Sequence, residues 1–174
     1  MTAQDEATED DRELLRQAIK VADDAVLHGN HPFGALLTDS DGQVVLTAEN
    51  TVVTDDDVTG HAETNLVRQA SRTIGRTGLA DYTLYTSCEP CAMCSGAIYW
   101  AGIHRVVYAL AETSLLALTG AHAENPTLKL PAGRYSRAGS APPSLSVRSS
   151  RKRPPKHTTP SGAEGPARPS DTAF

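Results

Sequence analysis

The sequence is poor in aromatic residues and contains no long hydrophobic run. Aromatic side chains make up 5% of its 174 residues. The core therefore depends on Val, Leu, Ile and Ala, a composition that suits a layered α/β fold better than an all-β sandwich. No apolar run approaches the roughly 20 residues that a transmembrane helix needs. The acidic N-terminus lacks the basic and apolar regions of a secretory signal. We therefore expect a soluble, cytoplasmic protein with no membrane segment.

Cysteine is also scarce. The three cysteines, Cys88, Cys91 and Cys94, lie within one stretch of seven residues. A disulfide framework requires paired and dispersed cysteines, so this arrangement argues against one. Clustered thiols in a chain without a secretory signal indicate metal binding or redox chemistry in a reducing compartment.

Charge divides the chain into two parts. Residues 132–174 hold eight Lys or Arg and two acidic residues, a net charge of +6, whereas residues 1–131 carry the remaining −11. An acidic domain does not attract a polyphosphate chain through its overall field, so we expect a small-molecule substrate rather than nucleic acid. The second part is rich in Pro, Ser and Arg and has no helix or strand periodicity. We predict one globular domain over residues 1–131 and a disordered basic tail over residues 132–174.

The pattern of apolar residues predicts helices and strands in the order α-β-β-α-β-α-β. The first two strands form a hairpin around Asp41-Gly42, and the last two should be parallel because a helix connects them. We therefore predict an α/β fold with a mixed sheet in a three-layer α/β/α sandwich. The helices are expected at 12–28, 61–74 and 90–101, and the strands at 33–38, 43–47, 82–86 and 105–110.

Two short motifs could hold a metal ion. His61-Ala62-Glu63 opens the second predicted helix, and Pro90-Cys91-Ala92-Met93-Cys94 opens the third. One imidazole and two thiolates supply three zinc ligands and leave one position for water, as catalytic zinc sites do. Zinc lowers the pKa of its bound water to roughly 7, and a nearby carboxylate can then move protons. We predict one zinc ion per chain, bound by His61, Cys91 and Cys94, with Glu63 as the catalytic residue.

Several of these residues also have a structural interpretation. A lone C-x-x-C motif occurs in redox proteins, and Cys88 as a fourth ligand would close the site and make the zinc structural. We favour a catalytic site, because Cys88 precedes Pro90 at a strand end and because a closed site leaves Glu63 without a role. Core packing explains Trp100 as well as a pocket role does, and Asn50 could simply end a strand as a turn residue.

Together the two motifs match the H-x-E…P-C-x-x-C signature of zinc nucleobase deaminases. Over about residues 10–120 the chain resembles the cytidine deaminase-like superfamily. Residues 86–101, with Pro32-Phe33-Gly34-Ala35 and Glu49-Asn50, are most similar to its guanine deaminase branch. The resemblance implies that the base is bound by Asn50 and by the backbone N–H of Ala62, in a pocket lined by Phe33 and Trp100. It also implies a homodimer and a C-terminal segment that completes the site, where this chain instead has its basic tail.

We therefore predict hydrolytic deamination of a free nucleobase, with guanine as the first candidate and cytosine or triazine-like bases next. In this prediction water activated by zinc attacks the amidine carbon, Glu63 is the proton shuttle, and ammonia is released. Two alternatives stay open: a tRNA adenosine deaminase, weakly favoured by the basic run at 148–156, and a non-catalytic zinc module that binds a partner. A binding module has no need of Glu63.

Overall fold

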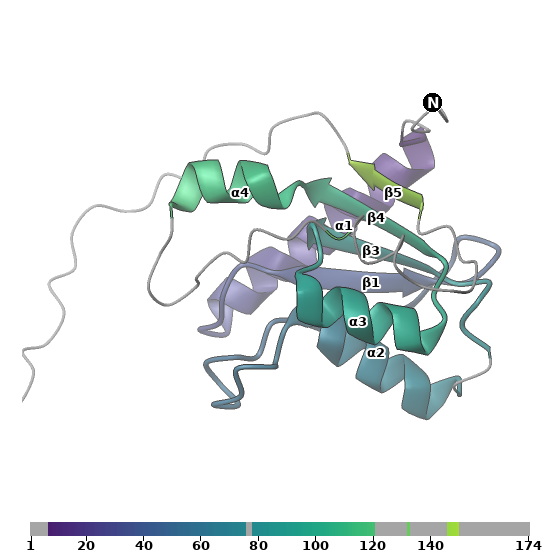
Figure 1. The fold of residues 1–174 in the computed structure, drawn as a ribbon, viewed down its shortest axis with the longest axis horizontal. Helices are drawn as coiled ribbons and strands as arrows, with labels where there is room; N and C mark the ends of the chain where they lie inside the picture. The colour runs from purple at the N-terminus through teal and green to yellow at the C-terminus, as the bar shows by residue number, and fades with distance from the viewer. Residues whose placement is uncertain (1–6, 76–77, 121–131, 133–145, 150–174) are drawn as a thin grey trace, which may run out of the picture.

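The structure, a computed structural model, describes residues 7–75, 78–120, 132 and 146–149. Helices and a single sheet form three layers, so the predicted α/β/α sandwich with a mixed sheet is confirmed (Figure 1). The elements in chain order are α1 (Glu9–Leu27), β1 (Gly34–Thr38), β2 (Val44–Glu49), α2 (Ala62–Thr73), β3 (Thr83–Cys88), α3 (Ala92–Ala101), β4 (Arg105–Leu110), α4 (Glu112–Thr119) and β5 (Ser146–Ser149).

The strand directions explain where a site can form. The strand order is β2-β1-β3-β4-β5. β1 is antiparallel to both β2 and β3, whereas β3 and β4 are parallel, as are β4 and β5. Consequently β2, β3 and β4 run in the same direction. The helices that follow them, α2, α3 and α4, therefore all begin at one edge of the sheet, where open α/β sheets tend to bind ligands.

Each face of the sheet carries its own apolar core. Helices α2 and α3 cover one face and α1 covers the other, as Figure 1 shows. Successive residues of one strand alternate between the two cores: Leu37 packs with Leu66 of α2, whereas Leu36 packs with Leu15 of α1. Helices α2 and α3, which carry the two motifs, therefore share one face of the sheet and one apolar core.

Helix α1 shows how local sequence sets an element's bounds. The Thr8 side chain accepts a hydrogen bond from the Asp11 N–H, and the Asp11 carboxylate accepts one from the Thr8 N–H, so the helix begins with a capping box. Its buried side chains recur at three- or four-residue spacing. The helix ends at Leu27, ahead of Gly29, which has a φ of +89° that favours glycine. The predicted start at residue 12 was late because the cap precedes the apolar pattern.

Three features differ from the sequence-based expectations. Pro90 does not lie in the first turn of α3, because Cys91 is the N-cap and the helix begins at Ala92. Helix α4 was not predicted. Strand β5 lies in a segment expected to contain no strand, because backbone pairing with the free edge of β4 requires no periodicity in the side chains. Most of residues 132–174 lie outside the described residues, so the division of the chain at residue 131 stays a prediction.

None of the helices in the described part of the chain is long and apolar enough to span a bilayer.

Candidate metal centre

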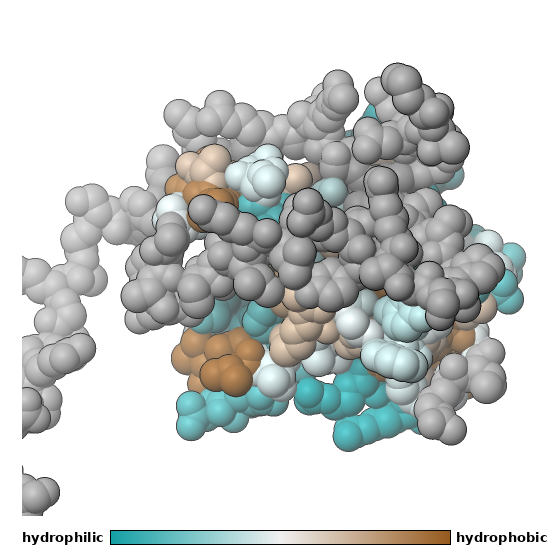
Figure 2. All heavy atoms as spheres, viewed as in Figure 1, coloured by the Kyte–Doolittle hydropathy of each residue, from teal (hydrophilic) through white to brown (hydrophobic). Residues whose placement is uncertain are grey.

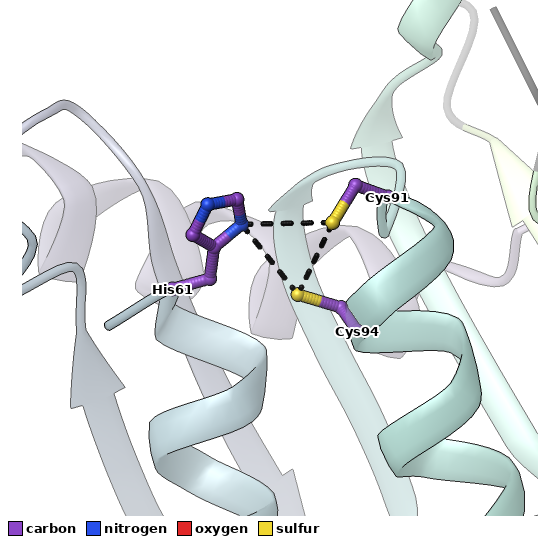
Figure 3. Close-up of side chains that lie close together, drawn as sticks. All are labelled: His61, Cys91 and Cys94. Carbon is purple, nitrogen blue, oxygen red and sulfur yellow. Dashed lines mark hydrogen bonds between the residues drawn. The ribbon is translucent and has the colours of Figure 1, made fainter. Parts of the chain in front are cut away.

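Three side chains converge where α2 and α3 begin. His61 is the N-cap of α2, Cys91 is the N-cap of α3, and Cys94 lies in the first turn of α3. In Figure 3 the imidazole of His61 points across the gap between the two helices toward both sulfurs. His61 Nδ1 lies 3.6 Å from Cys91 Sγ and 3.7 Å from Cys94 Sγ, and the two sulfurs are 3.6 Å apart. The sequence motifs therefore meet in space as predicted.

These separations fit zinc. Tetrahedral zinc, with Zn–S of about 2.3 Å and Zn–N of about 2.0–2.1 Å, separates two sulfurs by about 3.8 Å and a sulfur from a nitrogen by about 3.6 Å. All three observed distances lie within about 0.2 Å of those values, the tolerance appropriate to a preformed site. His61, Cys91 and Cys94 are thus positioned as zinc ligands. A three-ligand set leaves one tetrahedral position for water or substrate.

Cys88 does not join this ligand set. Among the described residues, the group of potential ligands whose donor atoms lie within 4.8 Å of one another contains His61, Cys91 and Cys94. Cys88 ends β3 and is buried, and burial raises the pKa of its thiol to about 12. By contrast, the hydrogen bond with Cys94, opposed by burial and assisted by His61, lowers the pKa of Cys91 to about 4. Position therefore separates Cys88 from the ligands, because its sulfur lies outside this group of converging donor atoms.

Glu63 lies beside the ligands but is held by other groups. Its side chain projects from the first turn of α2 and is 6% exposed. Thr86 Oγ1 donates a hydrogen bond to Glu63 Oε1 at 2.9 Å, and Cys94 Sγ lies 3.5 Å from Glu63 Oε2. Burial raises the pKa of Glu63, and the Thr86 hydrogen bond partly opposes that rise. A raised carboxyl pKa brings the group closer to the range where it can both accept and donate a proton at neutral pH.

Asn50 is placed as a hydrogen-bonding group in a buried position. It directly follows β2 and is 2% exposed. Its N–H donates to the Phe33 carbonyl at 3.0 Å, and its Oδ1 accepts from the Val52 N–H at 3.1 Å. Within the described residues no acceptor is found for Asn50 Nδ2. A buried amide donor without a protein partner is costly unless a ligand or water satisfies it.

Two other residues implied by the resemblance lie near the same helix start. Ala62 is fully buried and is the first residue of α2, so its N–H has no acceptor within the helix. Phe33 is partly buried against the core beneath α2 and α3. Both positions are compatible with the roles that the resemblance implies.

Trp100 lies on α3 with its side chain 84% exposed, so core packing does not explain this residue, and its pocket role stays a prediction. Six residues separate it from Cys94, which on a helix means a rotation of about 240° and an advance of about 9 Å. Its described aromatic neighbour is Tyr99, whose ring it meets edge-on at 5.4 Å between centroids.

Glu89 is a buried residue for which the sequence suggested no role. Its Oε2 accepts from the Glu112 N–H at 2.9 Å, and its Oε1 accepts from the Ala132 N–H at 3.0 Å. Glu112 therefore begins α4 beside the metal centre, where burial and then the negative charges of Cys91, Glu89 and Glu63 raise the pKa of its carboxyl. No local pattern signals this arrangement, because the partners of Glu89 are main-chain groups 23 and 43 positions away.

The fold and site together define a class of protein: a three-layer α/β domain with a single-metal centre of one imidazole and two thiolates beside a buried carboxylate. The chain belongs to the cytidine and deoxycytidylate deaminase family, since the family's zinc-binding region matches residues 8–110. It is thus a member of a zinc-dependent deaminase family.

Several relatives have stated activities. The chain is 47% identical over 123 residues to a probable cytosine deaminase of Schizosaccharomyces pombe, covering 71% of this chain and 74% of the relative. It is 44% identical over 101 residues to guanine deaminase of Bacillus subtilis, covering 58% and 64%. A tRNA-specific adenosine deaminase of Haemophilus influenzae is 34% identical over 105 residues, covering 60% and 61%. The matched region thus spans less than two thirds of the last two relatives.

A solved structure supports the fold assignment. The crystal structure of guanine deaminase from Bacillus subtilis matches with a TM-score of 0.58 and 40% identity, covering 62% of this chain and 69% of that chain.

Proposed function

We propose that this chain hydrolyses the exocyclic amino group of a free nucleobase and releases ammonia. Guanine, favoured by the motif around the cysteines, and cytosine, the base named for the relative at 47% identity, are the first candidates. The observation that carries the proposal is Glu63, a carboxylate that is 6% exposed, within 3.5 Å of a ligand sulfur, and outside the ligand set. A structural zinc site has no use for such a group.

His61, Cys91 and Cys94 would hold one zinc ion. When bound, zinc supplies a Lewis acid that makes water nucleophilic near neutral pH. Glu63 would take one proton from the attacking water and deliver it to a ring nitrogen. It would then take the second proton from the hydroxyl of the tetrahedral intermediate, as the new carbonyl forms, and deliver it to the amino group, which leaves as ammonia. Thr86 keeps the Glu63 side chain in one orientation during these transfers, because its hydroxyl donates to Oε1 and leaves Oε2 directed toward the ligands.

Base binding is assigned to the first residue of α2 and to the residue after β2. The Asn50 Nδ2 and Ala62 N–H groups are donors that suit the carbonyl and ring-nitrogen acceptors of guanine or cytosine. Phe33 contributes apolar surface from the start of β1. Such a site, apolar with a few convergent polar groups, is typical of small-molecule recognition.

The test is ammonia release by zinc-loaded protein from guanine, cytosine, adenine and their nucleosides, compared among wild type, Glu63→Ala and Glu13→Gln. We expect Glu63→Ala to retain one zinc per chain and to lose turnover by at least about a hundredfold, the usual share of acid–base catalysis. Glu13, an exposed residue of α1, is the control and should behave as wild type. Unchanged turnover in Glu63→Ala would remove Glu63 from the mechanism.

A tRNA adenosine deaminase is the second candidate, since a relative with that activity is 34% identical. Against it stands the net charge of −11 over residues 1–131. Incubation with adenosine-containing tRNA at two salt concentrations distinguishes the two candidates. Deamination that weakens steeply with salt would favour the tRNA substrate, because phosphate contacts release counterions.

We also propose a homodimer, as the family resemblance implies. The exposed face of α3 supports it, because Met93 is 37% exposed and Trp100 is 84% exposed on the same short helix. Light scattering gives the mass in solution, and a monomer at micromolar concentration would contradict the proposal.

A further inference from the structure

The loop between β2 and α2, residues 50–61, connects the proposed base-binding residue to a metal ligand. It starts at Asn50 and ends at His61. The two ends meet, because the Thr51 N–H donates to the Gly60 carbonyl at 2.8 Å. The approach is so close that a Cβ on Gly60 would lie 2.8 Å from Thr51 Oγ1 and 3.1 Å from the Thr51 backbone. Asn50 and His61 are thus neighbours through the base of a compact loop.

One side chain of α2 binds both ends of this loop. Asn65 Nδ2 lies 3.0 Å from the Glu49 carbonyl, 3.0 Å from Thr51 Oγ1 and 3.2 Å from the Gly60 carbonyl. The first two acceptors flank Asn50, and the third belongs to the residue before His61. An amide carries only two N–H donors, so one of them is shared between two acceptors.

The same loop is also held at a second place, by Asn30. Its Oδ1 accepts from the N–H groups of Val53 and Thr54, and its Nδ2 donates to Thr54 Oγ1. This part of the loop lies toward solvent: Val53 is 57% exposed and Val58 is 82% exposed. In Figure 2 hydrophobic surface gathers over this loop and over α4. Asn30 therefore orders the outer part of the loop, whereas Asn65 orders its base.

We propose that Asn65 is a positioning residue that sets the placement of Asn50 relative to His61, and thereby the orientation of the base toward the metal centre. The inference rests on the proposed function. Asn50 Oδ1 is bound to Val52 N–H, within the same loop, so the direction of its free Nδ2 follows the loop backbone. Without Asn65, the Glu49 carbonyl before Asn50 and the Thr51 side chain after it lose their hydrogen bonds to α2, the helix whose first turn bears Glu63. An Asn50 side chain without a fixed position must be ordered when the base binds, so base binding weakens.

The experiment compares Asn65→Ala with Asn30→Ala, a matched loss of an amide clamp on the same loop. The first readout is hydrogen exchange of the Thr51 amide in zinc-loaded protein, which requires no activity. The second is the KM and kcat for the base that the wild type deaminates. Cobalt substitution, read by the ligand-field spectrum, reports whether the three metal ligands keep their geometry. Asn65→Ser, which retains one donor, should be intermediate and replaces the alanine variant if that variant does not fold.

We expect the Thr51 amide of Asn65→Ala to exchange at least about tenfold faster than in wild type, and KM to rise by about tenfold. A tenfold change corresponds to about 1.4 kcal/mol, roughly the contribution of one neutral hydrogen bond. The kcat of Asn65→Ala should stay within about threefold of wild type, and Asn30→Ala should leave the Thr51 amide and KM unchanged. Unaltered Thr51 exchange in Asn65→Ala would overturn the inference, as would faster exchange with an unchanged KM. Equal effects of Asn65→Ala and Asn30→Ala would mean that Asn65 only stabilises the loop in general, and this result would also overturn the inference. If wild type releases no ammonia from any base, the proposed function and the substrate part of this inference fail together, and the exchange comparison still decides whether Asn65 closes the loop.

Discussion

Replacing Thr86 with valine should impair catalysis without disturbing the metal. Thr86 is fully buried in β3, and its hydroxyl donates to Glu63 Oε1 at 2.9 Å. Valine has nearly the same shape, so Thr86→Val removes this donor and leaves no large cavity. A hydrogen bond to a charged group contributes about 1.5–3 kcal/mol, and its acceptor Glu63 is only 6% exposed to solvent. If the transition state requires the Glu63 carboxylate in this orientation, kcat should fall by about 10- to 100-fold.

The pH dependence of Thr86→Val provides a second check. The Thr86 hydrogen bond lowers the pKa of Glu63 against the larger, opposing effect of burial. Removing the bond should therefore raise that pKa, and the acid limb of the kcat profile should move to higher pH.

Thr64→Val is the matched control, because Thr64 Oγ1 contacts Cys94 Sγ at 3.3 Å rather than the carboxylate. That variant should keep the wild-type acid limb. A Thr86→Val enzyme with wild-type kcat and an unmoved acid limb would refute the role given to this hydrogen bond.

Three further changes test the metal centre and the scaffold. Cys91→Ala should lose zinc, measured as metal per chain after dialysis. It should also lower the melting temperature, because metal ligation is coupled to folding. Equal metal content in variant and wild type would contradict the ligand assignment. Asp11→Asn should lower the free energy of unfolding by about 2–3 kcal/mol at pH 7. The reason is that Asp11 Oδ1 accepts hydrogen bonds from Arg105 at 2.7 Å and from Tyr85 at 2.9 Å. This value allows for solvent screening of the ion pair, because the Arg105 side chain is 29% exposed. Burial raises the pKa of Asp11, but the hydrogen bonds from Arg105, the Thr8 N–H and Tyr85 hold it below its ordinary value. The difference in unfolding free energy between wild type and Asp11→Asn should therefore persist above about pH 4 and shrink as the pH falls below it. A difference that grows at acid pH, measured by urea titration, would contradict this prediction. Gly34→Ala should lower the free energy of unfolding by about 1–3 kcal/mol, because a Cβ at this position would lie 2.6 Å from the Ala18 carbonyl of α1. An unchanged urea midpoint would mean that α1 can move away from β1.

The sequence by itself determined the layered fold and the metal ligands. Strand and helix periods are local properties, and three of the predicted elements, β4 among them, both begin and end within one residue of their observed bounds. His61, Cys91 and Cys94 could be predicted because the two motifs match the H-x-E…P-C-x-x-C signature of zinc nucleobase deaminases. Glu63 followed from the same motif, two residues after His61.

Only the tertiary structure shows which other residues contact the metal centre or its surroundings. The hydrogen-bond partners of three such residues are distant in sequence or are main-chain groups: Asn65, Thr86 and Glu89. Contacts of these two kinds leave no spacing pattern in the sequence. For Trp100 the sequence left a core position and a pocket role open, and only the structure shows that the side chain is 84% exposed and therefore not in the core. Side-chain type and local spacing predict which chemistry a segment can perform. The sheet registers and loop closures that only folding creates decide which side chains meet, because a hydrogen bond depends on positions to within a few tenths of an ångström.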